Sequence, residues 1–549
     1  MTTVSWKERV VEARRRLAES IPAELRIEVP QGKINVQKEG IQFLTKFEKD
    51  IISLDATTLL EAIKGKKYTC VEVFKAFSKS AAIVHQLTNS LTEYFPDEGL
   101  LMAQKLDDYY EKTGKTAGSL HGLPVSIKDH LELAGHLANM GFVTWAERRS
   151  PKNEDGIVKA LRQEGAVFYL KTAMPMSGMV LETASNLWGH VKNPYNTNLT
   201  SGGSSGGEAV MVALGGSAIG IGTDTAGSIR CPAAFCGLYA LKPTCFRFAY
   251  TGMLFPSPSQ ISIAGCPGPI AKSITDVKMF SKFLVDSEPW NSDPNVVPLP
   301  WKNDIEHKFK RKLTVGVIKF DGAVMPHPPV LRAIEICRER LQREGHEIID
   351  LELPFDSYEL MQNASKMYFL SGFKECKKLC EESGEPLIPA LEKVLERFNI
   401  EEFGGSVNFK INAYRNGVRK SFLEMWKKTA TQTQSKREID AIITPNSSCS
   451  AFPHDFLPWW GYTTTYNVLD VPSLVIPITG EYADPNKDSK DLTYEPINDW
   501  DKENYEIYDA EAFSGIPLNI QLVGKRYLEE DLIAIGEIID RAVNKKGCE

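Results

Sequence analysis

Two glycine-flanked serine clusters, joined by a run of small and apolar residues, constrain this chain more than any other feature. The segment covers residues 201–232 and reads SGGSSGGEAVMVALGGSAIGIGTDTAGSIRCP. Glycine lets backbone N–H groups approach a reacting oxygen closely, and both clusters are rich in it. Serine is the nucleophile that such N–H groups would serve. The pattern therefore predicts hydrolytic acyl transfer.

The composition is that of an ordinary globular protein. Of the 549 residues, 42% are hydrophobic and 25% are charged, and the net charge is -7. Basic runs lie beside acidic residues, which predicts solvated helix faces and does not indicate nucleic-acid binding. The ten cysteines show no disulfide framework and no second ligand pair for zinc. We therefore expect no metal site and a reducing compartment.

Targeting signals also bear on where the protein works. The first 25 residues carry many charges and lack the apolar core of a signal peptide. No stretch approaches the roughly 20 apolar residues of a membrane-spanning helix. Cys548 is penultimate, which does not match a prenylation box. These features predict a cytoplasmic protein without membrane association.

Alternating strand and helix patterns predict an α/β fold with a mixed sheet covered by helices. Residues 1–60 are expected to form a helical appendage with an amphipathic helix over 6–20, and residues 61–549 one large domain. The acidic, polar segment 484–509 is expected to be a surface insertion. Other expected helices cover 155–164 and 329–344, and the expected strands include 125–127, 217–221, 313–318, 439–444 and 517–523.

Lys128 is the first candidate for chemistry, because it follows the apolar strand 125–127 and precedes Asp129. A lysine at a strand end is usually a solvated surface charge. Apolar surroundings would instead disfavour its charged form and leave a neutral amine that accepts a proton. From this residue alone both interpretations stay open.

Ser204 is the second candidate and lies in the cluster GGSSGG at 202–207. A flexible glycine turn is the structural interpretation. A phosphate-binding loop is disfavoured, because Gly207 and Glu208 stand where that loop carries lysine. An α/β-hydrolase nucleophile elbow is also disfavoured, because it should follow a buried strand and residues 193–198 are a polar loop.

Ser228 is the third candidate and lies in GTDTAGSIR, residues 222–230, directly after the expected strand 217–221. In such a turn consecutive backbone N–H groups can form a nest around a developing oxyanion. The four N–H groups in question are those of Thr225, Ala226, Gly227 and Ser228. We interpret Asp224 and Arg230 as a structural ion pair rather than as reacting groups.

These three segments, in this order and at this spacing, resemble the amidase signature family. The similarity runs from about residue 60 to the C-terminus. Further segments that resemble family landmarks are residues 118–129, 193–194, 241–244, 268–270 and 515–524.

The resemblance implies one large α/β amidase-signature domain with a central mixed sheet flanked by helices on both faces. It also implies a Ser-cisSer-Lys triad, with Ser228 as nucleophile, Ser204 as proton shuttle after a cis peptide bond, and Lys128 as base, working without metal or cofactor. Gly178 matches a family residue whose backbone lies near the substrate. Ala226 departs from the glycine of many members, and its side chain could narrow the oxyanion hole or disfavour positive φ.

Within the family, residues 5–7, 86–89 and 95–97 look like fungal acetamidase-type enzymes. The resemblance then implies hydrolysis of a monocarboxylic acid amide, a small molecule, to carboxylate and ammonia through an acyl-enzyme. The alternatives are a glutaminase subunit of a transamidation complex, a lipid or aryl amide hydrolase, and a non-catalytic scaffold with the same fold. A homodimer is compatible with the resemblance. Three aromatic residues could line an acyl pocket or pack in the core: Trp459, Trp460 and Tyr466.

Overall fold

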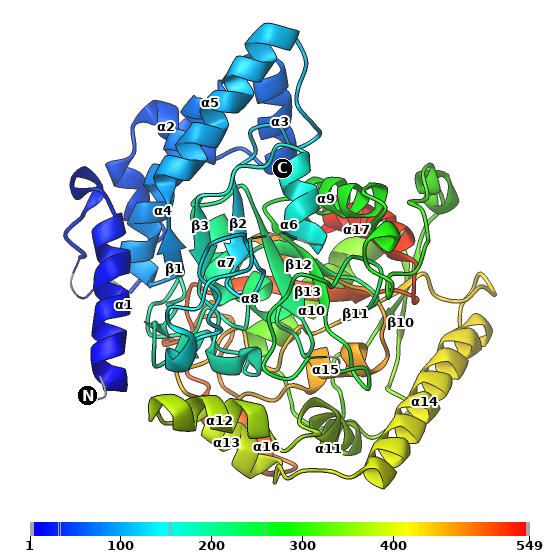
Figure 1. Ribbon diagram of the computed structural model, residues 1–549. Helices are drawn as coiled ribbons and strands as arrows, with labels where there is room; N and C mark the ends of the chain where they lie inside the picture. Colours follow the sequence, from blue (N-terminus) through cyan, green and yellow to red (C-terminus); the bar gives the residue numbers. More distant parts are fainter. Residues whose placement is uncertain are drawn as a thin grey trace.

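An eleven-stranded mixed sheet forms the centre of the protein (Figure 1). The computed structural model describes residues 5–544 except 31, 33, 153, 155 and 259, so the expected helix start at residue 155 and Cys548 lie outside the described residues. The strands of this sheet are β1 (Leu91–Tyr94), β2 (Val125–Lys128), β3 (Leu170–Thr172), β6 (Ile219–Asp224), β7 (Tyr239–Lys242), β8 (Cys266–Ala271), β9 (Thr314–Val317), β10 (Glu347–Asp350), β11 (Ala441–Thr444), β12 (Ser473–Tyr482) and β13 (Pro517–Val523).

Strand order in the sheet is β1-β3-β2-β6-β8-β7-β12-β13-β11-β9-β10. Parallel pairing joins β2 to β3 and β6, and joins β9 to β10 and β11. The other neighbours are antiparallel, so the expectation of a mixed sheet is confirmed. Strands β2, β6 and β8 are buried along their whole length, as expected of strands covered on both faces. A separate small sheet pairs β4 (Ala184–Ser185) with β5 (Gly189–His190).

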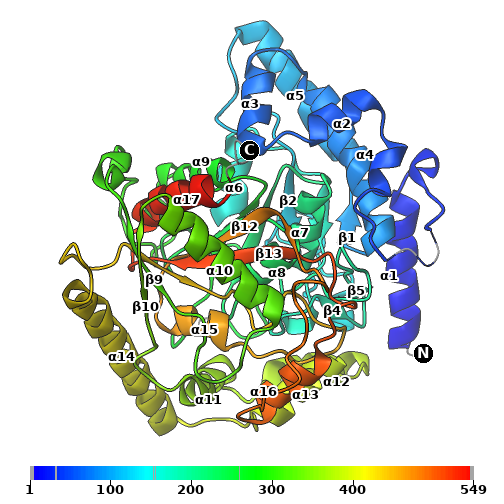
Figure 2. The same cartoon turned by 180° about the vertical axis from the view of Figure 1, so that it is seen from behind.

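Helices cover both faces of the sheet, and seen from behind α10 crosses in front of β13, with α17 beside α10 (Figure 2). Helices α9, α10 and α17 form one layer, with α17 touching the other two, while α7 and α8 contact each other and the sheet. The α-helices are α1 (Trp6–Ser20), α2 (Lys46–Ile52), α3 (Ala56–Lys64), α4 (Cys70–Thr88), α5 (Pro96–Thr113), α6 (Gly156–Gln163), α7 (Gly206–Ala213), α8 (Arg230–Phe235), α9 (Ile274–Asp286), α10 (Pro328–Arg343), α11 (Ser357–Tyr368), α12 (Lys374–Ser383), α13 (Pro389–Arg397), α14 (Gly405–Lys428), α15 (Gly461–Val468), α16 (Asp499–Ile507) and α17 (Glu529–Asn544).

Helix α1 begins and ends where the sequence predicts a helix. Ser5 and Glu8 form a capping box, in which each side chain accepts a hydrogen bond from the backbone N–H of the other. The buried positions of α1 share one face, as the amphipathic pattern requires. Arg14 donates hydrogen bonds to the carbonyl oxygens of Asn186 and Leu187, which ties the helix to the rest of the protein.

The acidic segment 484–509 has both an exposed and a buried part. Residues 489–498 are exposed or half-buried, whereas α16 directly after them buries Trp500 and Asp501. The Asp501 carboxylate accepts a hydrogen bond from the backbone N–H of Met325 at 2.8 Å. The segment therefore packs onto the domain through its helix.

Two further findings concern the described part of the chain. Its nine cysteines are free and buried. None of its helices combines the length and the apolar character needed to cross a lipid bilayer.

Candidate active site

Strand ends and helix starts bring the three predicted catalytic residues close together: Ser204 and Ser228 line one cavity, and Lys128 lies directly behind Ser204. Lys128 ends β2, and Ser204 lies two residues before α7. Ser228 lies in the turn between β6 and α8. Backbone contact joins the two serine clusters, because the N–H of Ser205 donates to the carbonyl oxygen of Ser228 at 3.1 Å.

The Lys128 amine sits among three hydroxyl groups and is fully buried. Its Nζ atom lies 2.8 Å from Ser204 Oγ, 2.8 Å from Ser205 Oγ and 2.9 Å from Thr223 Oγ1. Burial disfavours the ammonium form and lowers the pKa of Lys128 to about 7, although nearby carboxylates act in the opposite direction. The solvated surface charge, one of the two interpretations from the sequence, is therefore excluded.

The peptide bond between Gly203 and Ser204 is cis, as the resemblance implies. A side chain on Gly203 would place its Cβ 2.4 Å from the backbone of Glu182, so this position requires glycine. Thr183 holds the same loop from behind, since its hydroxyl donates to the carbonyl oxygen of Gly202 at 2.9 Å and accepts from the N–H of Gly206 at 3.0 Å.

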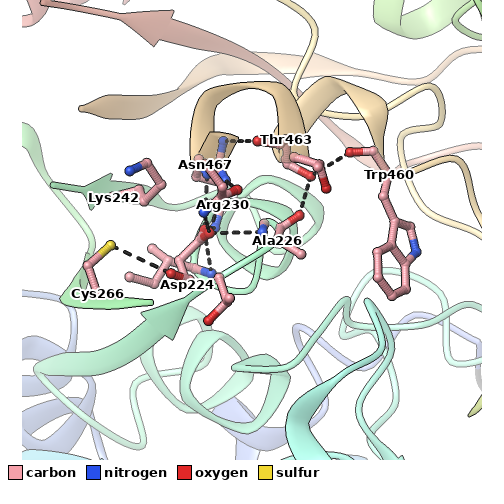
Figure 3. A network of polar contacts seen from close by, with 12 residues as sticks. Asp224, Ala226, Arg230, Lys242, Cys266, Trp460, Thr463 and Asn467 are labelled. Atoms are coloured by element: carbon pink, nitrogen blue, oxygen red, sulfur yellow. Dashed lines mark hydrogen bonds and ion pairs between the residues drawn. The ribbon is translucent and has the colours of Figure 1, made fainter. Parts of the chain in front are cut away.

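The turn that carries Ser228 is organised by the buried pair of Asp224 and Arg230 (Figure 3). Arg230 Nη2 and Nε lie 2.9 and 3.0 Å from the two oxygens of the Asp224 carboxylate. Burial alone would raise the pKa of Asp224, but Arg230 holds it well below its usual range. The ion pair expected from the sequence is confirmed.

Arg230 also reaches two elements far along the chain. It donates to the carbonyl oxygen of Thr463 at 3.0 Å and to the Asn467 side chain at 2.5 Å, both in α15. It donates to the side chain of Gln521 in β13 at 2.8 Å. The side chain of Arg230 therefore ties the turn to α15 and β13.

The structure differs from the predicted oxyanion nest at Gly227. Its N–H donates to the Asp224 carboxylate at 2.8 Å and is thus already engaged. Gly227 has φ 129°, and a Cβ there would lie 2.5 Å from Thr463 Oγ1, so glycine is needed for the turn itself. Ala226 is not among the non-glycine residues with positive φ, which removes the backbone concern raised by its side chain.

The sequence did not predict a role in the site for four side chains around Lys128. Thr223 was placed in a turn, but β6 extends to Asp224 and not to residue 221, so Thr223 belongs to the strand and contacts Lys128. His130 Nε2 lies 3.0 Å from Thr223 Oγ1. Ser205 was overlooked as a second lysine partner. The only sequence signal was their nearness to the predicted residues.

Glu208 is the fourth of these and is fully buried behind the site. Its carboxylate accepts from the hydroxyls of Ser126 at 2.5 Å and Thr172 at 2.6 Å, and from the N–H of Ile221 at 3.0 Å. Burial raises the pKa of Glu208 to about 7. The carboxyl therefore joins α7 to β2, β3 and β6, the strands that hold Lys128 and Thr223 in place.

A cavity of about 570 Å³ opens onto these groups. Ser204, Thr225 and Ser228 line it, and so does Gly178, which has φ +77°. Its remaining walls are mostly apolar. Within the described structure, the aromatic residues proposed for an acyl pocket are not part of its lining. They are buried in the core, which makes their packing interpretation the correct one: Trp459, Trp460 and Tyr466.

One group of possible metal ligands occurs outside the cavity, at Glu182, His190 and His454. His454 Nδ1 lies 2.6 Å from the Glu182 carboxylate, and its Nε2 lies 3.3 Å from the carbonyl oxygen of Thr197. Both ring nitrogens thus face acceptors, which suits a protonated imidazole rather than a metal ligand. Burial opposes protonation, but Glu182 outweighs it and raises the pKa of His454.

Comparison with known proteins supports the sequence resemblance. The family model named Amidase matches residues 72–533. An amidase of Gibberella zeae is 39% identical over 98% of this chain and 99% of its own length. The acetamidase of Emericella nidulans is 36% identical over 98% of each chain. A solved fatty acid amide hydrolase has a TM-score of 0.90 and 34% identity, covering 97% of this chain and 94% of its own.

The family model and the relatives match almost the whole chain, and the solved structure shows the same fold. The chain therefore belongs to the amidase signature family and is a hydrolase that acts on amide bonds.

Proposed function

We propose that the protein hydrolyses a monocarboxylic acid amide to carboxylate and ammonia, with Ser228 as nucleophile, Ser204 as proton shuttle and Lys128 as base. One observation carries the proposal. The buried Lys128 amine lies 2.8 Å from Ser204 Oγ, and Ser204 shares a cavity with Ser228. A base near neutrality beside a relay hydroxyl is what activation of a serine requires.

The hydrogen-bond directions support Ser204 as the shuttle. A neutral amine donates two hydrogen bonds and accepts one. Ser205 can direct its hydrogen to the carbonyl oxygen of Thr223 at 3.4 Å, and the Thr223 hydroxyl can direct its own to His130 Nε2 at 3.0 Å. Both oxygens are then left to accept from Lys128. Among the described residues Ser204 has no such second acceptor, so its hydrogen points to the amine.

His130 fits this arrangement because it is neutral. Burial lowers the pKa of His130 well below its ordinary value. The Nδ1 atom lies 3.3 Å from the carbonyl oxygen of Leu254, which suits Nδ1 as donor and leaves Nε2 as acceptor. His130 thereby orients Thr223, which is a positioning role rather than a catalytic one.

Catalysis would proceed in two halves. Lys128 takes the proton of Ser204, which takes that of Ser228 while Ser228 Oγ bonds to the amide carbonyl carbon. The developing oxyanion accepts hydrogen bonds from free N–H groups of the turn, for which Thr225, Ala226 and Ser228 remain once Gly227 is engaged. The proton then returns through Ser204 to the leaving nitrogen, and the C–N bond breaks. Water attacks the acyl-enzyme by the same relay, and carboxylate leaves.

Ammonia release from a panel of amides, measured for the wild type and for Ser228→Ala, tests the proposal. We expect turnover that disappears in the variant. A fluorophosphonate probe should label Ser228, and mass spectrometry identifies the labelled residue. Labelling at Ser204 or Ser205 would contradict the assignment. A non-catalytic scaffold would show neither turnover nor labelling.

Glutamine in the same panel separates the alternatives within the family. A glutaminase subunit of a transamidation complex would release ammonia from glutamine in preference to simple amides. A relative named acetamidase and a structure named fatty acid amide hydrolase leave both small and lipid-like amides as candidates. A cytoplasmic location and a homodimer stay predictions, for which fractionation and light scattering are the measurements.

A further inference from the structure

The cavity is far larger than the smallest amides require. Its volume is about 570 Å³. A water molecule in the liquid occupies roughly 30 Å³, so acetamide with its four heavy atoms fills on the order of 100 Å³. Drug-sized ligands occupy pockets of roughly 300 to 1,000 Å³. The space beside Ser228 therefore matches an acyl group much longer than acetyl.

Aromatic side chains make up much of the wall. They come from two chain segments, 250–255 and 368–403, and comprise Tyr250, Phe255, Tyr368, Phe369, Phe373 and Phe403. Tyr250 and Phe255 are stacked with ring centres 5.4 Å apart, and Phe369 meets Phe373 edge to face at 5.7 Å. Each methylene that an apolar group removes from water against such walls makes binding more favourable. An acyl group should therefore bind more tightly as its apolar chain becomes longer.

Tyr368 connects this apolar wall to the reacting end of the cavity. Its hydroxyl donates to the carbonyl oxygen of Thr225 at 3.0 Å and lies 3.2 Å from Thr464 Oγ1. Thr225 belongs to the turn that carries Ser228. A chain bound along the aromatic wall would thus have its carbonyl end at the nucleophile.

The charged side chains that line the cavity are carboxylates, although one of them, Glu402, forms an ion pair with Lys374, which does not itself line the cavity. Glu375 and Glu402 line it and are exposed, so they mark its open end. Glu375 accepts hydrogen bonds from Ser257 and Ser371, both at 2.8 Å. Partial burial opposes them, yet these contacts lower the pKa of Glu375, which is a carboxylate at neutral pH. None of the described lining residues is lysine or arginine, the side chains that recognise carboxylates.

We infer that the substrate is an amide with a long or aromatic apolar acyl group whose far end carries no negative charge. The inference rests on the proposed function and deepens it. It disfavours acetamide, and it also disfavours amides whose far end carries only a carboxylate, because like charges facing each other weaken binding.

Chain length is tested with acetamide, butanamide, hexanamide and 4-phenylbutanamide. One methylene in an apolar pocket is worth on the order of tenfold in specificity. We expect kcat/KM to rise at least a hundredfold from acetamide to hexanamide. Equal or greater kcat/KM for acetamide would overturn the inference.

End-group charge is tested with three amides of one chain length: hexanamide, 6-aminohexanamide and the monoamide of adipic acid. We expect the adipic monoamide to have the lowest kcat/KM, on the order of tenfold or more below that of 6-aminohexanamide. Glu375→Gln should narrow this ratio. The control Glu382→Gln removes an exposed carboxylate of α12 that does not line the cavity, and should leave the ratio unchanged.

A ratio of two substrates in one sample does not depend on the folded fraction, so a poorly folding variant still gives a result. Indifference to end-group charge, or a ratio unaltered by Glu375→Gln, would refute the charge part of the inference. If no amide releases ammonia and Ser228 stays unlabelled, the proposed function itself fails. Turnover restricted to acetamide leaves that function standing and refutes the substrate class.

Discussion

Replacing Lys128 with methionine is expected to change stability in a pH-dependent way, besides ending turnover. In the folded protein burial lowers the pKa of this amine from 10.5 to about 7. In the unfolded chain the lysine keeps its ordinary pKa. The unfolded state therefore binds the proton more tightly between pH 7 and pH 10.5, and over this range the stability of the wild type rises with pH.

The magnitude follows from the two pKa values. Lowering the pKa of Lys128 from 10.5 to about 7 costs the fold about 5 kcal/mol at low pH, since each factor of ten is worth about 1.4 kcal/mol. The cost is about 4 kcal/mol at pH 7, about 2 kcal/mol at pH 9, and vanishes above pH 10.5. Methionine avoids it but loses three hydrogen bonds, worth about 1 kcal/mol each at any pH.

The free energy of unfolding of Lys128→Met, relative to the wild type, should thus fall by about 2 kcal/mol between pH 7 and pH 9. Urea unfolding followed by tryptophan fluorescence at both pH values measures it. Lys105→Met is the matched control, because Lys105 is an exposed lysine on α5. A difference that is the same at pH 7 and pH 9 would show that burial does not keep Lys128 neutral.

Three further predictions concern pH and the buried pairs. Because the neutral amine of Lys128 is the proposed base, kcat/KM should rise with pH, reach half its maximum at about pH 7 and level off, which initial rates across pH 5–9 measure. Asp224→Asn leaves Arg230 buried without its counter-charge and should lower the free energy of unfolding by about 3–5 kcal/mol in urea titrations, whereas an unchanged midpoint would contradict the anchoring role. His454→Gln removes an ion pair with Glu182 whose contribution to stability is complete below pH 6.5 and is lost as pH rises through the raised pKa of His454. It should therefore lower the urea midpoint more at pH 6 than at pH 9, by about 1 kcal/mol in free energy, and an equal loss at both pH values would count against the pair.

The correct predictions of the fold came from local sequence patterns. Helix 6–20 and strand 517–523 have the bounds that their hydrophobic periodicity and flanking turn residues indicate. The mixed sheet followed from the alternation of strand and helix patterns. Strand 217–221 was placed too early, because the glycines and polar residues of 222–224 indicate a turn when tertiary pairing is ignored. Pairing with β8 keeps these residues in the strand.

The site was predictable only where the family resemblance names its residues. Lys128 meets Ser204 as the resemblance implied, and their contact is confirmed. The hydrogen bond between Thr223 and His130 forms because the parallel strands β2 and β6 lie side by side, and no local sequence pattern encodes that pairing. The cavity wall at residues 368–403 lies well over a hundred positions beyond the serines. Such distant partners require the folded chain.

Arg230 holds the nucleophile turn through a residue that the ribosome adds much later. Its contact with Gln521 spans 291 positions. At about 5–20 residues per second, a ribosome needs roughly 15–60 seconds to make that stretch. Through this interval the nascent chain already holds Lys128, Ser204 and Ser228, but not the strand that fastens the nucleophile turn. The enzyme would therefore become active only once β13 has left the ribosome, so that unfinished chains carry no working amidase.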